Sequence, residues 1–382
     1  MSAALASVEP AKILTAQPSV FDRSHWGRIR LTGADRVRFL HNQTTNNIER
    51  LSAGAGCRTV FVTSTGRTID LASVYAMPEA LFLVVSPGMA QSLYDWMDRY
   101  IFFSDKVTLQ DETAQTFMFT VLGEGADDVV RSLGADALIG QPEFTHQSVM
   151  LPGVELPVTI AVGSDLAIAG YTLWGTGRGT GRGTGQRTGQ RTGPAEASPE
   201  NSPENSPAQT PAQTPAQAKE QVWQALCAAG AAPSTPDQWE QLRIQQGRPM
   251  PACELTDDDN PLESGLWDSI SFEKGCYIGQ ETIARLNTYQ GVKKRLWGVI
   301  LERPLPVGTA LTVAGNKVGK LTSVAHLRTD TDATNDADTQ TFGLAYIRTK
   351  AGGPALTVEL DDTTAQVVTL PFITHEYYTP EK

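Results

Sequence analysis

The sequence predicts an α+β protein whose C-terminal part forms a separate small β-barrel. Residues 21–160 alternate strand-like segments with amphipathic helical segments. Residues 175–218 contain no large apolar residue, and from Lys293 onward only short strand-like segments occur, separated by Gly, Pro or Asn turns. A chain of 382 residues is too long for one small core, so two or three domains are expected.

The N-terminal region begins with a strand at His25–Leu31, which a Thr-Gly turn connects to a helix carrying Val37 and Leu40. Later strands are predicted at Cys57–Thr63, Thr68–Ala76, Leu81–Ser86, Val107–Leu109 and Thr116–Leu122. Helices are predicted after Pro87-Gly88 and near Ala126–Leu133. Together with the strands up to Leu173, these segments predict two subdomains of mixed α and β structure.

The low-complexity segment 175–218 interrupts this region. It repeats short Thr-Gly-Arg, Ser-Pro-Glu-Asn and Ala-Gln-Thr-Pro units and has no apolar surface to bury, so we predict a disordered surface insert. A solvated spacer is favoured over a basic binding patch on composition. The predicted boundaries are therefore residues 20–174 plus 219–291 for the α+β region and 292–378 for the barrel.

Ordered structure is expected again at Glu220, where apolar residues recur at helical spacing. Thr235-Pro236 then supplies a cap and a first-turn proline for a helix at Asp237–Gln246, and another helix is predicted at Gln280–Asn287. The barrel strands are predicted at Leu296–Leu301, Ala310–Val313, Lys317–Ala325, Phe342–Ile347, Ala355–Leu360 and Ala365–Leu370.

Composition excludes several classes of function. The net charge of −11 argues against general binding to nucleic acid or to a membrane surface, which needs a basic face. The four cysteines show no C-x-x-C spacing, and the five histidines form no close pair, so no metal site is predicted. Residues 1–20 carry Lys12 as their single basic residue, so we expect no signal or transit peptide and a cytoplasmic location with reduced thiols.

The segment from Lys274 to Glu281, Lys-Gly-Cys-Tyr-Ile-Gly-Gln-Glu, carries the strongest chemical signal. It places Cys276 between a lysine and the start of a helix, and both favour a thiolate. Residues 274–295 also hold five Lys or Arg against the single acid Glu281, which predicts an anion site. The alternatives are a buried structural cysteine and a simple helix pair between Glu281 and Arg285.

This octapeptide resembles the K-G-C-Y-x-G-Q-E signature of the YgfZ-type folate-binding proteins, relatives of the glycine-cleavage T-protein. Further similarity lies in Gly27–Leu40, Gln43–Ile48, Leu242–Pro249 and Pro261–Leu266. The resemblance covers most of residues 20–375 outside the insert. It implies a T-protein-like ring of mixed α/β domains around a central folate cleft, with tetrahydrofolate or a derivative as cofactor.

The resemblance also implies roles for individual residues. Cys276 would be the working thiol, with Lys274 beside it and Asp70 as a possible acid or base. The folate and the thiol would be positioned by Tyr277, Gln280, Glu281, Arg285, Gln245 and Glu263. Two positions depart from the aminomethyltransferase pattern. Asp70 is one residue out of step on its strand, so a solvent-facing role is an equal alternative, and Gln245 replaces the glutamate that would grip the pterin.

The function implied by the resemblance is a tetrahydrofolate-binding accessory protein for assembly or repair of iron–sulfur enzymes, including those that modify tRNA. We expect an accessory protein rather than a classical enzyme, with iron–sulfur clients or assembly factors as partners and no direct contact with nucleic acid or membrane. The alternatives are an aminomethyltransferase that passes a one-carbon unit to tetrahydrofolate, and a binding module in which Cys276 is dispensable.

Overall fold

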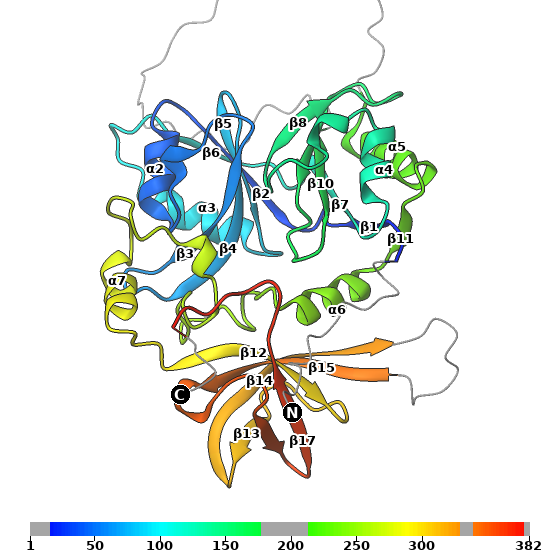
Figure 1. Cartoon of the computed structure of the whole chain (residues 1–382). Coiled ribbons are helices and arrows are strands. Elements are labelled where there is room, and N and C mark those ends of the chain that lie inside the picture. Colours follow the sequence, from blue (N-terminus) through cyan, green and yellow to red (C-terminus); the bar gives the residue numbers. More distant parts are fainter. Residues whose placement is uncertain (1–15, 177–212, 329–338, 378–382) are drawn as a thin grey trace, which may run out of the picture.

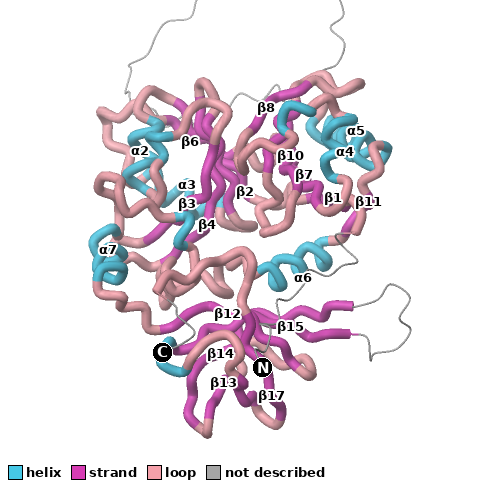
Figure 2. The backbone as a smooth tube through the Cα atoms, viewed as in Figure 1, coloured by secondary structure: helices cyan, strands magenta, loops and turns pink. Residues whose placement is uncertain are grey.

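The computed structural model describes residues 16–176, 213–328 and 339–377. Two mixed α/β halves lie side by side, and a closed β-barrel lies below both of them (Figure 1). Figure 2 shows that helices flank the outer sides of the two halves, whereas the barrel is built almost entirely of strands. The expected α+β class with a C-terminal barrel is confirmed.

The N-terminal half is a five-stranded sheet in the order β3-β4-β5-β2-β6. Its strands are β2 (Gly27–Thr32), β3 (Gly56–Val62), β4 (Thr68–Ala76), β5 (Ala80–Val85) and β6 (Thr108–Asp111). The helices α2 (Arg36–Gln43) and α3 (Ala90–Asp98) bury Leu40 and Leu93 against one face of this sheet. The predicted hairpin between β3 and β4 is present. Near its turn the pairing register shifts between Phe61 and Val62, where β4 carries one extra residue.

The second half is a six-stranded sheet in the order β11-β1-β7-β10-β9-β8. Its strands are β1 (Ser19–Asp22), β7 (Thr116–Leu122), β8 (His146–Val149), β9 (Val158–Val162), β10 (Gly170–Thr176) and β11 (Ala232–Ser234). The helices α4 (Ala126–Ser132) and α5 (Pro215–Ala228) cover its outer face. The short strands β1 and β11 pair in parallel and were not predicted, because only the tertiary pairing identifies them.

The inner faces of the two sheets meet in an aromatic core. Phe82 of β5 stacks on Trp174 of β10 with ring centroids 5.1 Å apart, and Tyr75 of β4 lies 4.6 Å from the same indole. All three rings are buried. This core holds the two sheets together, so residues that follow β1, β5 and β11 are brought to one edge of the seam.

The helix α6 (Pro236–Gln246) lies at the junction of the three parts, against β1 and against β14 and β15 of the barrel. It begins with the predicted cap: Thr235 and Gln238 form a reciprocal capping box, and Pro236 occupies the first turn. Gly247, at φ 87°, ends it in the left-handed region. The following segment, which contains the 3₁₀ turn η3 (Trp267–Ser269), leads to α7 (Gln280–Thr288).

The barrel closes in the order β12-β15-β14-β13-β16-β17. Its strands are β12 (Lys294–Leu301), β13 (Ala310–Val313), β14 (Asn316–Arg328), β15 (Thr339–Arg348), β16 (Thr357–Leu360) and β17 (Thr363–Val368). One buried cluster fills its interior, and a second joins Leu296 and Phe342 of the barrel to Tyr277 and Ile283 near α7.

The predicted insert overlaps ordered structure at both ends. Strand β10 continues to Thr176, and α5 begins at Pro215, five residues before the expected Glu220. The earlier start follows from a second capping box, in which Thr214 accepts from the Gln217 backbone and Pro215 occupies the first turn. The remainder of the predicted insert, residues 177–212, lies outside the described residues. In the ranges that are described, no helix is long and apolar enough to cross a membrane.

Candidate functional site

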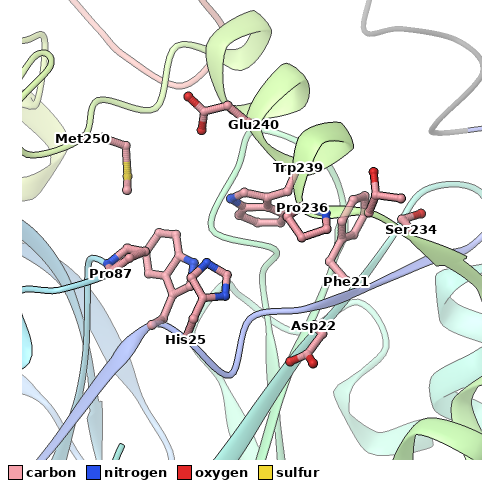
Figure 3. Close-up of a pocket in the computed structure, with 11 residues that line it drawn as sticks. Phe21, Asp22, His25, Pro87, Ser234, Pro236, Trp239, Glu240 and Met250 are labelled. Carbon is pink, nitrogen blue, oxygen red and sulfur yellow. The ribbon is translucent and has the colours of Figure 1, made fainter.

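A pocket opens where the seam between the two sheets meets α6. It is lined by Phe21, Asp22, His25, Trp26, Pro87, Ser234, Thr235, Pro236, Trp239, Glu240 and Met250 (Figure 3). These residues come from the end of β1 and the turn after it, the second residue after β5, the end of β11, the start of α6 and the segment after α6. Trp239 packs edge-on against Phe21 and Trp26, with ring centroids 5.4 and 6.3 Å away. These three rings therefore form an aromatic part of the wall, and the rest of the lining mixes apolar with polar side chains.

A buried arginine cluster lies against these aromatic rings. The Arg23 guanidinium lies 3.7 Å from the Trp26 ring centroid and 4.3 Å from that of Trp239, and the Arg248 guanidinium lies 4.5 Å from Trp26. Both guanidinium groups bind the carboxylate of Asp165, at 2.8 and 2.9 Å. The cluster is thus stacked and ion-paired at once, which holds the rings of the pocket in place.

Charge compensation keeps Asp165 ionised in this cluster. Burial alone would raise the pKa of Asp165, but Arg248, Arg23 and Arg58 outweigh burial and lower it. Burial lowers the pKa of Arg23 to about 10, although Asp165 opposes this shift. No sequence motif predicted this cluster. Arg248 does belong to the Leu242–Pro249 stretch, but Asp165 lies in a loop with no motif.

Asp70 lies behind the pocket and not on the surface. Its carboxylate accepts hydrogen bonds from the Ser86 backbone at 2.9 Å, the Ser86 hydroxyl at 2.6 Å and the Leu71 backbone at 2.8 Å. Burial raises the pKa of Asp70 to about 6, against the opposing effect of these bonds and of Arg248. The solvent-facing alternative for Asp70 is therefore wrong. Asp70 does not line the pocket. Ser86 lies between Asp70 and the pocket residue Met250, and its hydroxyl oxygen is 3.9 Å from the Met250 sulfur.

Gln245 and Glu263 are buried but do not meet at this pocket. Gln245 lies on α6 beside Gln246, whose amide nitrogen and oxygen are both buried without a protein hydrogen-bond partner. Glu263 accepts from the Asn260 backbone at 3.3 Å. Burial raises the pKa of Glu263, and Lys294 opposes that shift. The structure thus places Gln245 on a pocket-forming helix and Glu263 near the start of the barrel.

Buried polar atoms without protein partners are informative about what the central region can hold. Besides the Gln246 amide, the indole nitrogens of Trp26 and Trp239 lack an acceptor, and both tryptophans line the pocket. Figure 3 shows Trp239 and Met250 facing each other across this space. A buried polar group without a partner costs about 1–3 kcal/mol. A flat ligand with aromatic faces and hydrogen-bonding edges would match this set of groups.

The Lys274–Glu281 loop lies at a different place, against the C-terminal end of α2. The Lys274 ammonium donates to the backbone carbonyls of His41, Thr44 and Asn46, the last two at 2.7 and 2.8 Å. Burial lowers the pKa of Lys274 to about 8. The Ile278 backbone donates to the Asn42 carbonyl at 3.1 Å. Lys274 therefore anchors the loop on the carbonyl end of a helix, where a cation is favoured.

The loop buries Tyr277 and exposes Cys276. The Tyr277 ring lies 4.8 Å from the Lys274 ammonium nitrogen and belongs to the core cluster that reaches the barrel. Gln280 donates weakly to the Lys274 carbonyl at 3.5 Å. Cys276 is exposed between these anchored neighbours. Burial raises the pKa of Cys57 to about 12 and also raises those of Cys227 and Cys253.

His41 is a neighbour of this loop that the sequence did not single out. Its imidazole is buried, with Nδ1 lacking a partner and Nε2 4.0 Å from the Glu49 carboxylate. A Cβ added at Gly275 would lie 3.9 Å from Nε2. Burial lowers the pKa of His41, and Lys274 adds to this shift. A lone histidine on a short helix gives no sequence signal for this proximity.

The five cations at 274–295 do not form one anion site. Lys274 is bound by carbonyls, Lys294 pairs with Asp259 at 2.5 Å, and Arg295 is buried. Arg285 and Lys293 instead line an open depression along α7 together with Glu281. No ion pair joins Glu281 to Arg285, both within the described residues. No cluster of metal-ligating side chains occurs in the described ranges either.

Comparison with known proteins agrees with this architecture. Residues 6–156 match the family model described as the GCVT N-terminal domain, and residues 293–373 match the CAF17 C-terminal beta-barrel domain. A putative chloroplastic transferase of Arabidopsis thaliana is 41% identical over 359 residues, which cover 94% of this chain and 72% of that protein. An aminomethyltransferase of Geobacillus kaustophilus is 25% identical over 376 residues, covering 95% and 89% of the two chains.

A solved structure shares the whole fold. The glycine cleavage system aminomethyltransferase T of Bartonella henselae superposes with a TM-score of 0.71 at 15% identity, covering 97% of this chain and 90% of that one. At this identity the likeness concerns the fold alone. The expected T-protein-like arrangement, with mixed α/β sheets and a closed barrel, is confirmed.

Proposed function

This chain belongs to the YgfZ-type family of the glycine-cleavage T-protein (aminomethyltransferase) superfamily, and we propose that it is a tetrahydrofolate-binding accessory protein for iron–sulfur enzymes. It would support assembly or repair of client enzymes, including enzymes that modify tRNA. The observation that carries this proposal is the presentation of Cys276. Its neighbours Lys274 and Tyr277 are buried and bound, whereas the thiol itself is exposed. An exposed thiol on an anchored loop can act on another molecule without unfolding the loop.

The cofactor part of the proposal rests on the central pocket. Its aromatic wall suits the faces of a pterin, and the indole N–H groups of Trp26 and Trp239 would donate to the edge of the ring. Gln245 and Gln246 lie farther along α6, outside the pocket lining. There the two unpaired amide atoms of Gln246 would supply a donor and an acceptor to a folate that extends beyond the pocket. The folate supplies one-carbon and redox chemistry when bound. The residues of this chain would bind and orient it.

Complementation tests the accessory function. A strain that lacks its own YgfZ-type protein would receive the wild-type chain, Cys276→Ser or Cys253→Ser, and the activity of an iron–sulfur tRNA-modifying enzyme would be measured. Cys253 is the matched control because it is also an exposed cysteine but lies outside the signature. We expect the wild type and Cys253→Ser to restore activity and Cys276→Ser to fail. Full restoration by Cys276→Ser would favour the binding module without thiol chemistry.

Calorimetry tests the cofactor assignment separately. Gln246→Met has nearly the same side-chain volume but removes both unpaired amide atoms. We therefore expect it to keep or raise the melting temperature and to weaken tetrahydrofolate binding by roughly tenfold or more. If no reduced folate binds to the wild-type protein, the folate assignment is wrong.

Aminomethyl transfer is the second candidate, and the environment of Asp70 favours it. A buried carboxyl whose pKa is about 6 can exchange a proton near neutral pH. Against this function, Asp70 lies behind Ser86 and does not line the pocket. One-carbon transfer to tetrahydrofolate that Asp70→Asn abolishes would establish the enzyme, and no turnover by the wild type would exclude it.

Partners and location follow from the same proposal. Iron–sulfur clients or assembly factors would be the protein partners, and a cytosolic location is proposed from the reduced-thiol interpretation of the cysteines. The Arabidopsis relative is described as chloroplastic. Fractionation of cells that express the tagged full-length chain would test this location, and recovery in an organelle would contradict it.

A further inference from the structure

Four exposed basic residues gather where α7 meets the barrel. Arg285 lies on α7, Lys293 directly precedes β12, Arg348 ends β15, and Lys350 lies in the 3₁₀ turn η5 (Thr349–Ala351). We call these four residues the basic rim. Backbone contacts bring their segments together: Thr349 donates to the Lys293 carbonyl at 2.9 Å, and Arg348 pairs with Lys294 in the barrel sheet. The rim is therefore a tertiary feature, assembled from residues about sixty positions apart.

The rim carries charge that its surroundings do not neutralise. Within the described residues, none of its four side chains forms an ion pair. Arg285 and Lys293 line the depression along α7, in which Glu281 is the single acidic residue. The chain as a whole has a net charge of −11, so the positive charge of this surface is opposite in sign to the net charge of the molecule. Complementary potentials of this kind guide association with an oppositely charged partner.

The exposed aromatic side chain of Tyr289 belongs to the same surface. Tyr289 lines the depression between Arg285 and Lys293, and 76% of it is exposed. Tyrosine and arginine are the residue types that most often supply binding energy at protein interfaces. The exposed Cys276 lies four residues before α7 and Tyr289 directly follows this nine-residue helix, so the proposed working thiol and the rim lie at the two ends of the same helix.

We propose that the basic rim and Tyr289 form the docking surface for an acidic segment of a protein partner. This inference deepens the proposed function, because an accessory protein must hold its client while Cys276 acts. The rim shares no residue with the central pocket proposed for the pterin, so a partner segment could occupy the rim while folate is bound in that pocket. A peptide fits better than a nucleic acid. The continuous phosphate charge of a nucleic acid would extend over the surrounding surface of a chain with net charge −11.

Fluorescence anisotropy on the full-length protein tests the docking surface. The probes are a labelled glutamate-rich peptide, a lysine-rich peptide and a single-stranded RNA, all of equal length. We expect the glutamate-rich peptide to bind at low salt and to weaken at high salt. The double variants Arg285→Glu/Lys293→Glu and Arg348→Glu/Lys350→Glu should each weaken its binding by roughly tenfold. Tyr289→Ala should weaken it without changing the salt dependence.

The matched control is Arg99→Glu/Lys106→Glu, which makes the same change in charge at two exposed bases that follow α3. It should leave the dissociation constant within about twofold. The proposal is wrong if this control weakens binding as much as the rim variants, or if the acidic peptide does not bind at low salt. RNA binding as tight as peptide binding would overturn the assignment to a protein segment. These readouts do not depend on folate or on client activity, so their failure is distinct from failure of the proposed function.

Discussion

Replacing Lys274 by methionine should undock the signature loop from α2. The ammonium donates to three carbonyls, and the bonds to His41 and Thr44 are buried while that to Asn46 is partly buried. Methionine keeps the length of the side chain but leaves two buried carbonyls without a donor. At about 1–3 kcal/mol for each unsatisfied group, the docked loop should lose roughly 3 kcal/mol.

Native-state hydrogen exchange measures this loss where it occurs. The Ile278 amide donates to the Asn42 carbonyl, so its exchange rate reports how often the loop leaves α2. A loss of about 3 kcal/mol corresponds to a rise of roughly a hundredfold in the opening constant. Lys293→Met, an exposed lysine in the same region, is the control and should change the rate by less than about threefold. An Ile278 rate that Lys274→Met leaves within the range of the control would refute the anchoring role of Lys274.

Three further predictions concern reactivity, the insert and pH. Alkylation at neutral pH should modify Cys276 fastest and Cys57 slowest, because burial raises the pKa of Cys57 to about 12; mass spectrometry that finds equal rates would contradict this. Deleting residues 177–212 should shift the melting temperature by only a few degrees in calorimetry, since this composition buries no apolar surface, and a large drop would show that the segment packs on the fold. Folding raises the pKa of Asp70 from 3.8 to about 6, so the folded state binds its proton more tightly and stability should fall as pH rises through that interval. Asp70→Asn should flatten this slope in denaturation curves, and an unchanged slope would exclude Asp70 as its source.

The local signals in the sequence were sufficient for many elements. The hairpin β3–β4, the cap and proline that begin α6, and the strands of the barrel follow from residues within a few positions of one another. The helix α5 shows how such a signal can be overlooked. Its capping box at Thr214 lies inside a low-complexity repeat, so the predicted start was five residues late.

The candidate site depended on contacts that no local pattern contains. Asp70 was a candidate from its motif, but its burial and its bonds to Ser86 result from the packing of β4 against β5. The arginine cluster joins Arg23, Asp165 and Arg248. Asp165 is more than eighty residues away from each of the two arginines along the chain.

The sequence by itself determined the family signature and the division into an α+β region and a barrel, and it singled out Cys276 as the candidate thiol. These features depend on residue types and spacings within short segments, which determine local backbone structure directly. Only the tertiary structure decided that Lys274 anchors a loop, and that the five cations near Cys276 separate into bound, buried and exposed groups. The physical reason is that a charge acts through its distance, burial and partners in space, and none of these is encoded by position along the chain.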